Sequence, residues 1–99
     1  MRRMLPILLV LVTACAGRPA PDATGGAIYA RVCSHCHGAD LEGGVGPALG
    51  AGSQVPDLPD EYLTRVVTDG KGSMPAFGPT LTADQIARVV AYLRDEASS

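Results

Sequence analysis

The 99-residue sequence contains no tryptophan, and Phe77 is its only phenylalanine. It has a single lysine, Lys71, and neither cysteine nor histidine after His37. A chain of this length forms one domain at most, and so few large aromatic side chains would leave its core marginal without a disulfide, a metal or a bulky bound group. The remaining sequence must therefore supply such a support.

The first 15 residues have the pattern of an export signal. Arg2 and Arg3 precede an apolar run over residues 4–12, and small residues then lead to Cys15. This run is much shorter than the roughly 20 residues that span a bilayer as a helix, which argues against a retained transmembrane anchor. The protein is therefore expected to act outside the cytoplasm, in the periplasm or its equivalent.

Two cleavage sites are compatible with this segment. "LVTAC" resembles a bacterial lipobox, in which residues 1–14 are removed as a signal peptide and Cys15 is lipidated. Ala14-Cys15-Ala16 also satisfies the A-x-A pattern of ordinary signal peptidase, which would leave Gly17 as the first residue. We favour the lipoprotein interpretation, because cysteine is an unusual choice for a position that any residue could fill. Cys15 would then anchor the protein to a membrane.

The segment after the signal is expected to be a linker. Residues 15–24 are rich in alanine and proline and have no apolar period, which predicts an extended tether before a domain over residues 25–99. Loss of Arg2 and Arg3 leaves six basic and ten acidic side chains, a formal charge of about −4. This charge argues against nucleic acid as a partner, since such binding depends on basic side chains that neutralise phosphates.

Three segments have helical patterns, over residues 24–36, 59–70 and 81–97. In the last one, Thr82 and Gln85 are the two partners of a capping box. The loops between the segments are rich in glycine and proline and show no strand-like alternation, so the sequence predicts an all-α fold with three main helices. The buried stripe of the last helix is expected to comprise Ile86, Val89, Val90, Leu93 and Ala97.

Both histidines of the chain and two of its three cysteines lie within five residues, in "CSHCH". A structural zinc site would need a second pair of ligands from a distant segment, and none follows His37. A thioredoxin-like redox pair would need a βαβ pattern, which is absent, and would leave His37 unexplained. Zinc and disulfide chemistry therefore fit this segment poorly.

The third interpretation accounts for every residue of the motif, because C-x-x-C-H is the attachment signature of c-type haem. Cys33 and Cys36 are predicted to bond covalently to one haem, and His37 to bind its iron. Residues three apart share one face of a helical turn, and the next residue projects where it meets the iron. His35 is a spacer and is expected to be partly exposed.

Elimination indicates the second iron ligand. Met1 and Met4 leave with the signal, so Met74 is the only methionine of the mature chain. It lies in the loop "GKGSMPAFG", where Pro75 biases it toward an extended backbone, and thioether ligation of haem is a known use of methionine. Lys71, three residues earlier, is the obvious substitute if Met74 is lost.

With these motifs, residues 25–97 resemble a small single-haem class I cytochrome c of bacterial type. The resemblance implies the cytochrome c fold, with long loops wrapped around the haem. Gly25 and Tyr29 match the contact positions of the family's first helix, and Tyr92 matches the aromatic residue of the last helix that crosses it. In "GPAL", residues 46–49, the carbonyl of Pro47 is expected to accept the second N–H of His37.

With His37 and Met74 on the iron, no coordination position would be open, so we expect a carrier of single electrons and not an enzyme. Its partners would be membrane-bound or periplasmic redox proteins such as dehydrogenases, oxidases or reductases. Two alternatives stay open at this point. One is a haem sensor or peroxidase-like enzyme with a displaceable methionine, and the other is a haem subunit docked permanently in a larger oxidoreductase. The single lysine distinguishes the chain from the lysine-rich mitochondrial cytochromes.

Overall fold

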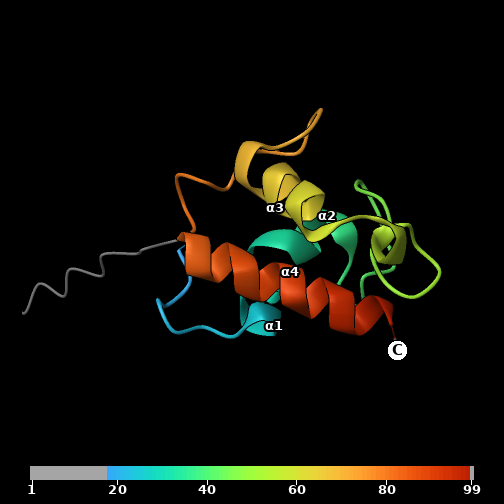
Figure 1. Ribbon diagram of the computed structural model, residues 1–99, viewed down its shortest axis with the longest axis horizontal. Helices are drawn as coiled ribbons and strands as arrows, with labels where there is room; N and C mark the ends of the chain where they lie inside the picture. The colour runs from blue at the N-terminus through green and yellow to red at the C-terminus, as the bar shows by residue number, and fades with distance from the viewer. Residues whose placement is uncertain (1–17, 99) are drawn as a thin grey trace, which may run out of the picture.

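The computed structural model describes residues 18–98, so the signal peptide and Cys15 lie outside the described residues. The chain is all-helical within that range, apart from one isolated bridge between Lys71 and Met74 (Figure 1). No helix between residues 18 and 98 is long and apolar enough to cross a membrane. The elements in chain order are α1 (Gly25–Ile28), the π-helical turn η1 (Tyr29–Cys33), α2 (Ser34–His37), the 3₁₀ turn η2 (Val55–Asp57), α3 (Asp60–Asp69) and α4 (Ala83–Ala97). Because α1, η1 and α2 follow one another without a break, the three helices predicted from the sequence are confirmed.

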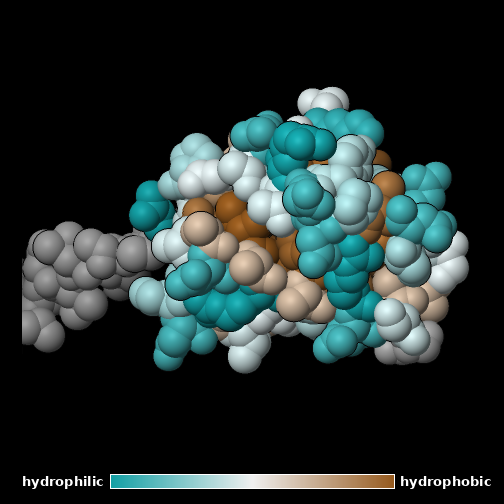
Figure 2. All heavy atoms as spheres, in the orientation of Figure 1, coloured by the Kyte–Doolittle hydropathy of each residue, from teal (hydrophilic) through white to brown (hydrophobic). Residues whose placement is uncertain are grey.

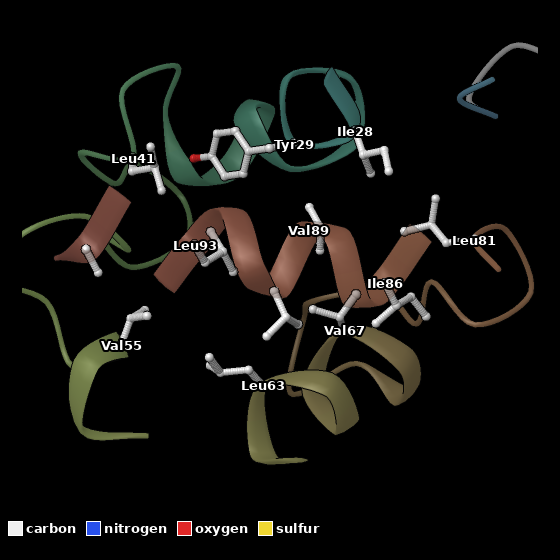
Figure 3. Close-up of a cluster of buried hydrophobic side chains, with 12 residues drawn as sticks. Ile28, Tyr29, Leu41, Val55, Leu63, Val67, Leu81, Ile86, Val89 and Leu93 are labelled. Carbon is white, nitrogen blue, oxygen red and sulfur yellow. The ribbon is translucent and has the colours of Figure 1, made fainter. Parts of the chain in front are cut away.

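Helix α4 begins where the capping box predicts. The hydroxyl of Thr82 accepts from the N–H of Gln85 at 3.1 Å, and the Gln85 side chain accepts from the N–H of Thr82 at 2.8 Å. All five residues of the predicted stripe are buried. Figure 3 shows α4 between the first helix, which contributes Ile28 and Tyr29, and α3, which contributes Leu63 and Val67. The last helix is therefore the centre of the core.

The first helix crosses α4 at a glycine, as the resemblance implied. A Cβ atom on Gly25 would fall on the carbonyl oxygen of Arg88 and lie 2.9 Å from the Cβ atom of Tyr92. One turn further, the rings of Tyr29 and Tyr92 meet with their centroids 5.5 Å apart. Glycine is thus needed at position 25 because the two backbones approach closely there.

Helix α3 also follows its local signals. Pro59 is its N-cap residue, and Gly70 ends it with φ at +78°. The loop before α3 is fastened to α4 by the guanidinium of Arg94, which bonds the Asp60 carboxylate at 2.6 Å and the carbonyl of Val55 at 2.9 Å, and also donates to the carbonyl of Leu58. One arginine near the end of α4 thereby positions both η2 and the start of α3.

The segment before α1 is also attached to the fold. The buried Gln85 side chain donates to the carbonyl of Ala20 at 3.0 Å, and Arg88 donates to the carbonyls of Pro21, at 3.0 Å, and Ala23. We refer to residues 18–23 as the N-terminal strap. The proposed tether over residues 15–24 is therefore held on α4 over its second half.

Candidate haem centre

The C-x-x-C-H motif lies at the end of the first helix. The turn η1 widens the helix just before it, with the N–H of Ser34 donating to the carbonyl of Tyr29 five residues back. Cys33 is half-buried and Cys36 is exposed, and both are free. Burial raises the pKa of the Cys33 thiol to about 11, so in the unmodified chain this thiol stays protonated at neutral pH. Widened turns of this type are frequent at functional sites.

The imidazole of His37 is held on two sides. Its Nδ1 lies 2.7 Å from the carbonyl oxygen of Pro47, the contact that the resemblance implied. Because that oxygen only accepts, Nδ1 carries a proton, and in the neutral imidazole the lone pair that can bind a metal is then on Nε2. Gly46 packs on the ring, since a Cβ atom there would lie 2.9 Å from Cε1 of His37. A larger residue at position 46 would push the imidazole out of place.

The backbone around His37 is fixed by the loop that carries Pro47. The N–H of Gly46 donates to the carbonyl of Cys36 at 2.8 Å, and the N–H of Gly43 donates to that of His37 at 2.7 Å. These bonds hold loop 43–47 against the motif independently of the imidazole. The ring orientation is thus built into the backbone of the protein.

Met74 lies on a loop that is tied to α3. The N–H of Met74 donates to the carbonyl of Lys71 at 2.9 Å, and the N–H of Phe77 donates to the carbonyl of Val67 at 2.9 Å. A Cβ atom on Gly70 would lie 2.5 Å from the Met74 carbonyl oxygen, so the loop leaves α3 through a position that requires glycine. The Met74 side chain is half-buried and packs against the core.

Lys71 is engaged in this structure. Its Nζ donates to the hydroxyl of Tyr62 at 2.7 Å and lies 5.5 Å from the centre of that ring. The guanidinium carbon of Arg65 is 6.0 Å from the same centroid. Lys71 would therefore have to leave Tyr62 before it replaced Met74 as a ligand.

Some apolar side chains remain partly exposed at the edge of the core. Several are only half-buried although they pack against the core, and they come from the first helix, the loops and α3: Val32, Cys33, Leu49, Leu58, Tyr62, Met74 and Phe77. Figure 2 shows apolar side chains at the surface between the hydrophilic residues of α3 and α4. A haem would bury such exposed apolar area and supply the aromatic bulk that the sequence lacks.

Sequence reasoning did not find two contributors to this region. Gly46 was not recognised as the residue behind His37, and the Tyr29 hydroxyl, which donates to the carbonyl of Gly38 at 2.6 Å, had no sequence signal. Between residues 18 and 98, no group of three or more His, Cys, Asp or Glu side chains gathers to hold a metal ion.

Comparison with known proteins assigns the family. The family described as "Cytochrome C oxidase, cbb3-type, subunit III" matches residues 20–93. The chain belongs to it and is a monohaem class I cytochrome c. Family membership implies one covalent haem c, with the C-x-x-C pair at Cys33 and Cys36. It also supports an extracytoplasmic location for this cytochrome.

Three relatives illustrate the similarity. The cytochrome c subunit of 4-cresol dehydrogenase [hydroxylating] from Pseudomonas putida is 35% identical over 92 residues, which cover 91% of this chain and 75% of the relative. Cytochrome c6 from Picosynechococcus sp. is 35% identical, and the match covers 100% of this chain and 97% of the relative. The structure of cytochrome c6 from the diatom Phaeodactylum tricornutum superposes with a TM-score of 0.65 at 31% identity and covers 75% of this chain and 91% of its own. This cytochrome is thus a cytochrome c6-like electron carrier and not an enzyme.

Proposed function

We propose that this cytochrome transfers single electrons between extracytoplasmic redox proteins through a haem c that is ligated by His37 and Met74. The contact of 2.7 Å between Nδ1 of His37 and the carbonyl oxygen of Pro47 carries the proposal, because it leaves Nε2 free as a ligand. It also increases the basicity of the imidazole, as such second contacts do in metal sites generally. The half-buried Met74 on its glycine-bounded loop is the complementary soft ligand.

The bound haem supplies a one-electron Fe(III)/Fe(II) couple. The protein's task is then to hold both ligands in nearly the same place in the two oxidation states, since any rearrangement would slow transfer. The bonds of Gly43 and Gly46 to the motif, and of Phe77 to α3, provide that rigidity from the backbone. A methionine ligand raises the reduction potential, which suits a carrier that accepts electrons from dehydrogenases.

A permanently docked subunit is a second candidate, because one relative is the cytochrome c subunit of a 4-cresol dehydrogenase. Purification under mild conditions distinguishes the two roles. A shuttle is expected to elute alone, whereas a subunit would elute with a larger oxidoreductase. In both cases the electron partners are redox proteins.

Covalent attachment gives a direct test of the site. We expect acid–acetone extraction of the denatured protein to leave one haem on the polypeptide, because thioether bonds at Cys33 and Cys36 survive unfolding. Absorbance of the extracted protein and its intact mass measure the retained haem. Cys36→Ser provides the comparison, because its haem would be held by a single thioether, at Cys33. Release of all the haem from the wild type would contradict the assignment of both cysteines.

We also propose that Cys15 is lipidated and anchors this cytochrome to a membrane, on the sequence grounds of "LVTAC". One acyl chain holds a protein only marginally, whereas two or three chains hold it stably, at about 0.8 kcal/mol per inserted carbon. The wild type is therefore expected in the membrane fraction and Cys15→Ser in the soluble fraction. Fractionation and intact-mass measurement check this. A mature chain that begins at an unmodified Gly17 would show that ordinary signal peptidase had removed Cys15.

A further inference from the structure

Tyr29 contacts both ends of the haem-attachment motif. Its backbone carbonyl accepts from the N–H of Ser34, directly after Cys33. Its hydroxyl donates to the carbonyl of Gly38 at 2.6 Å, directly after His37. One residue on the preceding turn thus spans the five residues of the motif.

The Tyr29 hydroxyl belongs to a buried side chain that packs against α4. The Tyr29 side chain is 1% exposed, and its ring packs on Tyr92 of α4 with a centroid distance of 5.5 Å. Figure 3 shows the Tyr29 ring beside α4, with its oxygen on the side of Leu41. Burial raises the pKa of Tyr29 to about 12, so the hydroxyl keeps its proton and donates at physiological pH.

The backbone carbonyls at the end of the motif, in residues 36–38, also accept hydrogen bonds from other donors. The carbonyls of Cys36, His37 and Gly38 accept from the backbone N–H groups of Gly46, Gly43 and Leu41, at 2.8, 2.7 and 3.2 Å. All three donors lie on the loop that follows the motif. The Tyr29 hydroxyl is the donor that comes from the crossing of the first helix with α4, so it connects the turn to the core.

We propose that Tyr29 is a positioning residue for His37: its hydroxyl holds the turn after the motif so that the imidazole stays against the Pro47 carbonyl. This inference rests on His37 being an iron ligand. If the bond to Gly38 is lost, the carbonyl of that residue keeps its longer bond from the N–H of Leu41, at 3.2 Å, and the contact between Nδ1 and Pro47 weakens. A weaker contact makes the imidazole less basic, which destabilises Fe(III) relative to Fe(II) and raises the reduction potential.

Tyr29→Phe tests the inference, because it removes the hydroxyl and keeps the ring and its packing. In the reduced holoprotein we expect the His37 Nδ1 proton to exchange with solvent about tenfold faster than in the wild type, which corresponds to about 1.4 kcal/mol. The midpoint potential should rise at the same time. The matched control is Tyr92→Phe, which removes the hydroxyl of the other ring of the pair and leaves the bond to Gly38 in place. Its exchange rate and potential should equal those of the wild type.

Wild-type exchange and potential in Tyr29→Phe would overturn the inference, even if its melting temperature fell, because a merely structural hydroxyl would move only stability. Equal changes in Tyr92→Phe would overturn it, because the effect would then not depend on the bond to Gly38. If Tyr29→Phe does not fold, the wild type still decides. The Tyr29 hydroxyl proton should exchange slowly with solvent and show an NMR contact to Gly38. Absence of this contact would overturn the inference. His37 ring protons without the shifts of an axial ligand would refute the ligation itself, and the role of Tyr29 with it.

Discussion

Met74→Ala is expected to give a folded, haem-containing protein whose reduction potential falls by on the order of 100 mV or more, since axial ligands set haem potentials over a range of about 0.8 V. The thioether is a soft ligand that favours Fe(II), and its loss leaves the iron open or bound by a stronger donor. The absorption band of iron–sulfur charge transfer should disappear. Redox titration and optical spectroscopy measure both effects.

Lys71 would determine whether the iron of Met74→Ala stays open or is bound by the lysine amine. Its amine must first leave the Tyr62 hydroxyl, to which it donates at 2.7 Å, and then lose its proton. The double variant Met74→Ala with Lys71→Ala should therefore have an open iron that binds CO rapidly on reduction. Ser73→Ala, on the same loop, serves as the control. Rapid CO binding by the reduced wild type would instead favour the sensor or peroxidase alternative, and an unchanged potential in Met74→Ala would exclude Met74 as the ligand.

Gly25→Val is expected to destabilise the protein by overpacking the crossing of the first helix with α4. A Cβ atom at this position falls on the carbonyl oxygen of Arg88 and lies 2.9 Å from the Cβ atom of Tyr92, so both overlaps are with atoms that have little freedom to move. Overpacking of this kind costs about 1 to 3 kcal/mol, and for a domain of this size each kcal/mol lowers the melting temperature by about 4 to 8 °C.

Gly26→Ala is the matched control for that variant. Its Cβ atom would lie 3.2 Å from an edge atom of the Tyr92 ring, which can shift by a few tenths of an ångström. Thermal unfolding of the two holoproteins should therefore separate them clearly. Equal melting temperatures for Gly25→Val and the wild type would mean that the first helix does not approach α4 at this residue.

Local signals account for the success of the helix predictions. The side chains of Thr82 and Gln85 bond the backbone within one turn, and Gly70 ends α3 by its own left-handed conformation, so neighbouring residues suffice to infer both. The stripe of α4 follows from helical periodicity alone. The haem motif is also local, because Cys33, Cys36 and His37 lie within five residues.

Contacts between distant residues account for what the sequence did not reveal. Gln85 is a capping partner by its pattern, but its amide also donates to Ala20, 65 residues away. The Tyr29 hydroxyl and Gly46 meet the end of the motif only after the chain has turned back on itself. Arg88 has the sequence pattern of a surface residue on α4, and nothing in the sequence indicates that it binds the strap.

The N-terminal strap limits how far an anchored domain could move. If Cys15 is in the membrane, residues 15–19 separate it from the bond between Ala20 and Gln85, and at about 3.1 Å per residue they could extend at most roughly 16 Å. A free linker of nine residues would extend roughly 28 Å. The volume accessible to the domain grows as the cube of the linker's length. The shorter linker therefore confines the cytochrome to about one fifth of the volume that the longer one allows, and it raises the effective concentration at a membrane partner about fivefold. Arg88 and Gln85 would thereby determine how often the carrier meets its partner, although neither residue lies near the iron.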